Sequence, residues 1–341
     1  MRLVGGALAA MAVLSGCAQD TAIRPDLSVI LADRPAETLR AYGLFKDQQA
    51  EQPADGVVAY DLINPLFSDH AEKDRYVFVP MGETATYQPD EVFEFPVGSV
   101  LIKSFSYEET GTIETRLLIH KSKGWVAYPY VWNAERTDAH YAPIGAKQSL
   151  DIVEPGTGDA ITIAYSVPNQ NQCKTCHQAG DALTPIGPKA RNLDHIGPNG
   201  RFQVADWTER GVLSGAPQDI SAVPAIEDAA ADIALRARAY LDINCAHCHK
   251  DEGSASNSGL WLEWTEEEPV RLGVGKHPTA AGRGAGDLEL VVVPGEPDAS
   301  ILVHRMASTE AGVAMPELGR TVVHEDGVEL VQAWIADLDK D

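Results

Sequence analysis

The apolar positions of the chain change their period about two thirds of the way along it. From about residue 54 to 168, short runs rich in β-branched and aromatic residues alternate with Gly, Pro and polar turns, a pattern typical of β-strands. The strand candidates are residues 76–79, 100–105, 115–120, 125–132 and 160–165. The third and fourth flank a turn with Gly124 and predict a hairpin. Short strands at this spacing predict a β-rich, sandwich-like N-terminal domain.

A helical period replaces the strand pattern from about residue 228. Apolar side chains then recur at steps of three and four residues, which predicts helices at both ends of the segment 228–341. The recurring positions are Ala230, Ile233, Ala234, Ala237, Tyr240 and Leu241, and later Val328, Val331, Ile335 and Leu338. Shorter helices are expected around Trp207 and at residues 300–306. The expected fold class is therefore multidomain α+β, with a β-rich domain followed by a mostly α-helical one.

Residues 1–16 have the pattern of an export signal. Arg2 precedes an apolar run that is too short to cross a bilayer, as in a secretory signal peptide. The run ends in Leu14-Ser15-Gly16-Cys17, which resembles a bacterial lipobox, so Cys17 is the expected lipidation site. The alternative is an ordinary signal peptide with an incidental cysteine. The lipobox predicts a lipid anchor in the bacterial cell envelope, facing the periplasm or the exterior.

Composition narrows the classes of partner. At 341 residues with 44% hydrophobic content, the chain is long enough for two or three globular domains. Its formal net charge is −23, without a basic stripe, which argues against nucleic acid as a partner. An acidic surface favours basic partner proteins, or simply solubility.

The five cysteines are the most informative residues of the chain. One is Cys17, and the other four form two Cys-x-x-Cys-His patterns, at residues 173–177 and 245–249. This is the attachment pattern of c-type haem. Two thiols form thioethers with the haem vinyl groups, and the adjacent histidine ligates the iron. We therefore predict two covalently bound haem c groups, held by Cys173 and Cys176 with His177, and by Cys245 and Cys248 with His249.

Two other uses of paired cysteines fit the sequence less well. Two Cys-x-x-Cys pairs can form a structural four-cysteine zinc site, but about 70 residues separate these pairs, and each is followed by a histidine. A thioredoxin-like redox pair would be set in a βαβ pattern, and neither motif is. His247 is expected to be a spacer within the second motif. Haem attachment is the leading interpretation.

Residues 228–340 resemble a class I cytochrome c domain. The resemblance is carried by the second motif, a Pro-Gly-x-Pro-x-x-Ser-x-Leu stretch at 294–302, Met315-Pro316, and Trp334-Ile335 in the last helix. It implies that Met315 is the axial ligand opposite His249, and Pro316 restricts that loop. The rival, Met306, is expected to pack in the core. The whole chain resembles, more loosely, a family of uncharacterised bacterial di-haem cytochromes, through residues 65–69 and 186–193.

The sixth ligand of the first haem is harder to predict. No methionine lies between His177 and Met306, so the ligand is a histidine, a more distant residue, or absent. His195 is the nearest histidine in the following loop and is our prediction. The alternatives from the β-rich domain are His70, His120 and His140. An open position would let peroxide or a small gas reach the iron.

These patterns divide the chain into a signal peptide (1–16), a tether (17–53), the β-rich domain (54–168), a first haem-binding segment with a linker (169–227) and a cytochrome c-like domain (228–341). The predicted function is electron transfer outside the cytoplasm, with an exported dehydrogenase or another cytochrome as redox partner. The alternative is a di-haem peroxidase-like enzyme, or another haem oxidoreductase, with an open coordination site at the first haem. A weaker alternative is carbohydrate binding by aromatics of the β domain, namely Trp125, Tyr128, Tyr130 and Trp132.

Overall fold

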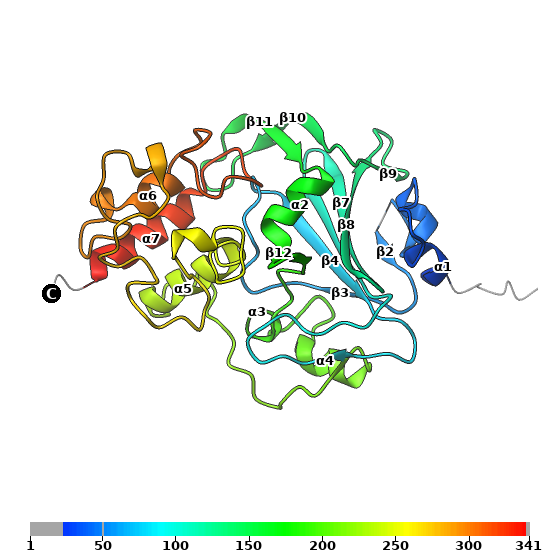
Figure 1. Cartoon of the computed structure of the whole chain (residues 1–341). Coiled ribbons are helices and arrows are strands. Elements are labelled where there is room, and N and C mark those ends of the chain that lie inside the picture. Colours follow the sequence, from blue (N-terminus) through cyan, green and yellow to red (C-terminus); the bar gives the residue numbers. More distant parts are fainter. Residues whose placement is uncertain (1–22, 50, 339–341) are drawn as a thin grey trace, which may run out of the picture.

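The computed structural model describes residues 23–49 and 51–338, so the predicted signal peptide and Cys17 lie outside the described residues. The described part contains helices and a large antiparallel sheet, so the fold is mixed α+β, as predicted. The sheet occupies one side of the molecule and the C-terminal helices the other, with helix α2 (Gln170–His177) between them (Figure 1). None of the described helices is long and apolar enough to cross a membrane.

One sheet of six antiparallel strands forms the centre of the β-rich part. Its strands, in spatial order, are β3 (Val57–Tyr60), β4 (Glu72–Phe78), β6 (Val100–Tyr107), β7 (Gly111–Lys121), β8 (Gly124–Trp132) and β9 (Ala139–Tyr141). The predicted hairpin is confirmed, because Lys121 pairs with Gly124 at the turn between β7 and β8. The candidate at 160–165 lies in β11 (Ala160–Val167), which pairs with β10 (Ala146–Val153) in a separate ribbon.

A β-sandwich would require a second large sheet packed on the first, and the described residues do not form one. Every other sheet in the described ranges has two strands. One face packs on the N-terminal segment, where Tyr42 of the 3-10 turn η1 (Leu39–Tyr42) meets Tyr130 edge-on. The opposite face packs on Trp207 of α4 (Gln203–Glu209) and on α2. An alternating pattern shows that a face is buried, but not which kind of element buries it.

Short elements connect these layers. They are α1 (Leu27–Ile30), α3 (Ala190–Leu193), the 3-10 turns η2 (Ser256–Ser258), η3 (Gly282–Ala285) and η4 (Pro297–Ala299), and the strand pairs β1 (Phe45–Asp47) with β2 (Gln52–Pro53), β12 (Gln178–Ala179) with β13 (Ala182–Leu183), and β5 (Ala85–Thr86) with β14 (Leu213–Ser214). Gly43 ends η1 with a φ of 66°, and a Cβ there would lie 2.7 Å from the carbonyl oxygen of Arg24. Glycine is therefore needed at this stop.

The C-terminal part has a hydrophobic core of its own. Helices α5 (Ile233–Asn244), α6 (Ile301–Met306) and α7 (Glu325–Asp337) surround a cluster whose members all lie between Ile226 and Leu338. Asp232 caps the start of α5 by accepting from the amide of Leu235 at 3.1 Å, which satisfies one free donor of the first turn. Both terminal helices were predicted from their apolar period, and both are confirmed.

Side chains bridge the seam between the β-rich part and the C-terminal part. Arg191 of α3 and Asp242 of α5 form an ion pair in which their side chains are only 6% and 9% exposed. Asp69, before β4, accepts a hydrogen bond from the amide of Val322 at 3.1 Å and from Thr321 Oγ1 at 3.0 Å. Such contacts hold the two parts in a fixed arrangement, because a buried carboxylate is costly unless it is paired.

Candidate functional site

The first Cys-x-x-Cys-His motif lies on helix α2. Asn169 and Gln172 form a capping box at the start of this helix, which fixes where it begins. Cys173 is buried, and the ring nitrogen Nδ1 of His177 lies 2.9 Å from the carbonyl oxygen of Thr184. Because a carbonyl only accepts, Nδ1 carries the proton, and Nε2 is left as the atom that can ligate a metal.

The second motif follows helix α5 in a tight turn. The amide of His249 donates to the carbonyl oxygen of Cys245 at 3.0 Å and closes the turn. His249 Nδ1 lies 3.1 Å from Ser258 Oγ, which donates its own hydrogen to the carbonyl of Ala255 at 2.7 Å. The hydroxyl therefore accepts from Nδ1. His249 thus has the same arrangement as His177, with Nε2 left as the ligand atom.

Both motif histidines are neutral at physiological pH. Burial lowers the pKa of His177 to about 3 and the pKa of His249 to about 4, because a protonated imidazole loses its hydration in the interior. The neutral imidazole is the form that ligates a metal. Among the residues that the structure describes, neither Nε2 atom has a hydrogen-bond partner.

A cavity of about 370 Å³ brings the second motif and Met315 together. We call it the Met315 cavity. His249, Met315 and several aliphatic residues line it. The aliphatic residues are Leu260, Leu262, Val291, Ile301 and Leu302. Polar side chains, among them Asn244, Ser254, Asn257, Thr279 and Arg305, line the rest of the cavity. Ligand and cofactor sites usually combine apolar side chains with placed polar groups.

Arg320 holds the loop that carries Met315. Its Nη2 donates to the carbonyl oxygens of Met315, Ser308 and Met306, at 2.8, 2.8 and 3.0 Å. The rival ligand Met306 is 5% exposed and belongs to the C-terminal core, although it also lines the Met315 cavity. Arg320 was not predicted from the sequence, because it contacts backbone carbonyls, and only the conformation of the loop shows which carbonyls lie within its reach.

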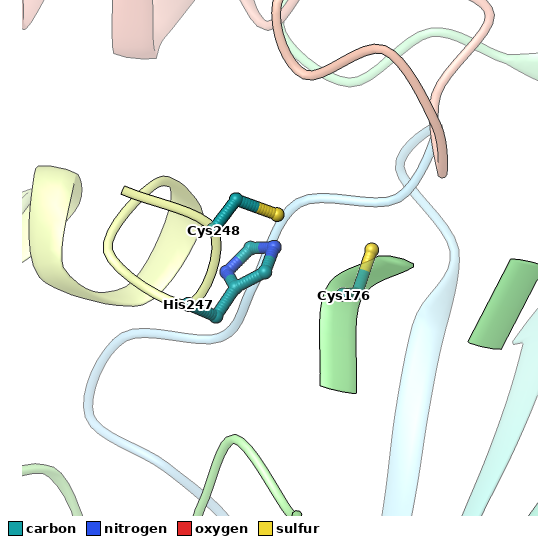
Figure 2. Close-up of side chains that lie close together, drawn as sticks. All are labelled: Cys176, His247 and Cys248. Atoms are coloured by element: carbon teal, nitrogen blue, oxygen red, sulfur yellow. The ribbon is translucent and has the colours of Figure 1, made fainter. Parts of the chain in front are cut away.

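The fold brings the two motifs next to each other. The sulfur atoms of Cys176 and Cys248 and a ring nitrogen of His247 all lie within 4.8 Å of one another. Figure 2 shows Cys176 on α2 opposite His247 and Cys248, which follow α5. The interaction between the two neighbouring thiols lowers the pKa of Cys248 and raises the pKa of Cys176. Nothing in the sequence links the motifs, so this contact could not be predicted.

His177 lines two smaller cavities. The seam cavity, of about 90 Å³, lies between His177 and the C-terminal part, where Met315 and His324 also line it. The sheet cavity, of about 100 Å³, lies between His177 and the large sheet, where Lys103 and Arg116 line it. Both cavities also include Cys173.

The histidines predicted as candidates for the sixth ligand of a haem on the first motif lie in different places. His195 Nε2 is 2.9 Å from Asp61 Oδ1, and His195 is not among the described residues that line the seam or sheet cavity. His120 stacks on Trp125, and His140 lies on β9. His70 packs edge-on against Phe67 near the seam. His195 stays a prediction, and ligation by it would require its contact with Asp61 to break.

The other residues that sequence reasoning missed are cations and one histidine. Lys103 directly follows the apolar residues 100–102 of strand β6, and Arg116 directly precedes the apolar residues 117–119 of strand β7. A charged residue beside an apolar run was the available signal. His324 stacks on Phe67 with ring centroids 4.1 Å apart, and burial lowers its pKa to about 4.

No protein-family model, curated protein or solved structure matches the chain.

Proposed function

We propose that the protein is a di-haem c-type cytochrome that transfers electrons outside the cytoplasm. The observation that carries the proposal is the arrangement shared by His177 and His249. In each motif a fixed oxygen, of Thr184 or of Ser258, holds Nδ1–H and leaves Nε2 free. A haem-ligating histidine needs this orientation and this tautomer, whereas a site built from four cysteines would need neither.

The residues around the second motif fit a haem with one thioether ligand. Cys245 and Cys248 would form the covalent links, and His249 and Met315 would ligate the iron from the wall of the same cavity. A thioether is a soft ligand that favours Fe(II), so it raises the reduction potential relative to a second histidine. Arg320 would act as a positioning residue, because it fixes the backbone on which Met315 is carried.

The residues around the first motif fit a haem between the two parts of the protein. Cys173 and Cys176 would form the thioethers, and His177 would ligate the iron. The contact of Cys176 with Cys248 would bring the thioether edges of the two haems close together. The haems supply the redox chemistry, and the chain supplies the ligands, the burial and this short path.

The proposed setting is the bacterial cell envelope, with Cys17 as the lipid-bearing residue. The net charge of −23 would favour a partner that presents a basic surface, and an exported dehydrogenase or another cytochrome has the required chemistry. A lipid anchor would confine the protein to the membrane surface, where collisions with such partners are more frequent.

The test is the visible spectrum of the full chain matured in a host with a cytochrome c assembly system. We expect two covalent haems per chain by haemochrome assay, and a ferric charge-transfer band from methionine ligation. A chain that matures without covalent haem would contradict the proposal.

A second candidate is a thiolate metal site, favoured by the cluster of Cys176, His247 and Cys248. Structural zinc is held by four ligands, and the described residues supply three within this cluster. Metal analysis of the same preparation separates the candidates. One zinc ion per chain together with no haem absorption would support the metal site, whereas two haems would exclude it, because haem attachment consumes both thiols.

A further inference from the structure

The cavities beside His177 are positively charged, although the protein as a whole is acidic. The chain contains 50 Asp and Glu residues against 27 Lys and Arg residues. Even so, no acidic residue in the described part of the chain lines the seam cavity or the sheet cavity. The cations that line them are Arg75, Lys103, Arg116 and Arg320. A nearby cavity of about 490 Å³ has more acidic than basic residues in its lining: Glu91, Asp242, Asp251, Glu252 and Glu263 against Lys189 and Lys250.

Three of these cations form a row across the sheet. Arg75 on β4 pairs in register with Lys103 on β6, and Lys103 pairs with Arg116 on β7. Residues directly opposite each other on adjacent strands point to the same face, and all three line the sheet cavity. We call Arg75, Lys103 and Arg116 the cation row.

The cation row lacks the anions that its charge requires. Arg75 is only 6% exposed, and among the described residues it donates one hydrogen bond, to the carbonyl oxygen of Lys73 at 3.0 Å. Lys103 has no hydrogen-bond acceptor in the described ranges, and its ammonium lies over the ring of Phe105. Only Arg116 has a carboxylate partner, Glu114. A guanidinium has five donors, and buried cations without partners are costly.

We infer that the cation row is a binding site for an oxygen anion of the carboxylate class, placed beside His177. Among the described residues, neither Arg75 nor Lys103 forms an ion pair with a carboxylate. Burial and the neighbouring cations lower the pKa of Lys103 well below its ordinary value, since like charges on opposing strand positions repel each other. A carboxylate between Arg75 and Lys103 would accept charge-assisted hydrogen bonds from both. Both His177 and Cys173 line the same cavity, so the anion would lie close to the first proposed haem.

Two sources can supply the carboxylate that binds to the cation row. One is a propionate group of the haem on the first motif, and that form of the inference rests on the proposed function. The other is a free anion from solution, which would bind next to the iron and would make the first haem a site that responds to a small carboxylate or oxyanion. The two sources give different experimental results, because added acetate cannot displace a propionate that belongs to a covalently attached haem.

The test compares the wild type with Lys103→Met and Arg75→Met in the full matured chain. Methionine fills similar space, and removal of a buried unpaired charge is not expected to unfold the protein. Lys123→Met, at an exposed turn position, is the matched control, and Lys103→Arg keeps the charge. One readout is the redox-difference infrared spectrum with ¹³C-labelled haem propionates. The other is the thermal midpoint in acetate, exchanged for chloride at constant ionic strength.

If propionate is the anion, the labelled carboxylate band shifts in Lys103→Met and Arg75→Met, but not in Lys123→Met or Lys103→Arg. If a free anion is bound, acetate raises the wild-type midpoint with saturation, and half-saturation in Lys103→Met needs about ten-fold more acetate, as expected for loss of one charge-assisted hydrogen bond. Unchanged bands together with an equal acetate response in all variants would overturn the inference. A chain without covalent haem would refute the proposed function, while its acetate response would still decide the anion site.

Discussion

The same five-residue pattern occurs in two different settings. The first motif lies on a capped helix between two parts of the molecule, and cations of the large sheet line its cavities. The second lies in a turn after α5, within a core built only from the C-terminal part and beside Met315. The second setting is therefore built mostly within one part, and only Thr175 and Cys176 of α2 reach its cavity from outside, whereas the first depends on elements from both parts. The five-residue pattern specifies the covalent chemistry of each motif. The residues that the fold packs around the motif decide which further ligands, such as Met315, and which charged side chains lie beside it.

Removal of the cysteines of one motif should give the largest effect. We expect Cys245→Ala/Cys248→Ala to leave only the first haem and to remove the methionine charge-transfer band, because thioether links need both thiols. Cys173→Ala/Cys176→Ala should leave one haem that keeps this band. Haemochrome assay and visible spectra check both results. Cys17→Ser is the control: it should retain two haems and lose membrane fractionation. Loss of both haems from either double variant would show that the motifs do not mature independently.

The next largest effect should come from the seam that the first motif depends on. Arg191→Met leaves the carboxylate of Asp242 buried and unpaired, which should lower the free energy of unfolding by about 3–5 kcal/mol. Arg283→Met breaks an arginine–carboxylate pair of the same kind with Glu310, but both of its side chains are more than 60% exposed, so less than about 1 kcal/mol is expected. Urea unfolding of both variants checks the difference. Equal losses would show that burial of the seam pair has no energetic role.

The secondary structure was more predictable than the surroundings of the site. Strands β4, β6, β7, β8 and β11 and helices α4, α5, α6 and α7 were predicted from local patterns, and the hairpin at Gly124 was confirmed. Helix α2, which carries the first motif, and strands β3, β9 and β10 were not predicted. The elements that cover each face of the sheet could not be predicted, because the alternating pattern of a strand is the same whether a helix or a second sheet packs on it. The strand pattern alone therefore predicted sandwich-like packing, and this prediction was wrong, because the other sheets in the described residues have two strands each.

The motif cysteines, His177, His249 and Met315 were nominated from sequence, since covalent chemistry and ligation impose residue types and spacings, whereas His324 was missed. The contact between Cys176 and Cys248 was not predictable, because it depends on how α2 and α5 meet. Lys103 and Arg116 were treated as parts of strand patterns, although a charged residue beside an apolar run already indicates a special requirement. His195 was chosen because it is near His177 in sequence, and nearness in sequence gave no information about Asp61, its actual neighbour.

Loss of the thioether should change the second site alone. In Met315→Ala we expect the charge-transfer band to disappear and the potential of one haem to fall by a fraction of the about 0.8 V range that axial ligation spans. The other haem should keep its potential. Met306→Leu is the control, because it removes a sulfur from the same cavity while preserving core volume. Spectroelectrochemical titration resolves the two haems. A band that survives in Met315→Ala and disappears in Met306→Leu would reassign the ligand.

The smallest effect concerns the cations near the first site. Lys73 lies on the same sheet face as Arg75, and burial lowers its pKa to about 7. An unfolded lysine has a pKa near 10.4, so between pH 7 and about 10.4 the unfolded chain binds more protons than the folded one. Stability should therefore rise with pH in this window, by at most about 1.4 kcal/mol per pH unit for this single group.

Lys73→Met should remove this rise, and Lys123→Met, at an exposed position, should retain it. Urea unfolding at pH 7, 8, 9 and 10 in buffers without carboxylates gives the slope for each protein, and the difference between slopes isolates Lys73 from the other groups that titrate. An anion on the neighbouring cation row would offset the positive potential and raise the pKa of Lys73, so acetate should flatten the wild-type slope. Equal slopes for wild type and Lys73→Met would mean that Lys73 keeps its proton in the folded protein throughout this pH range.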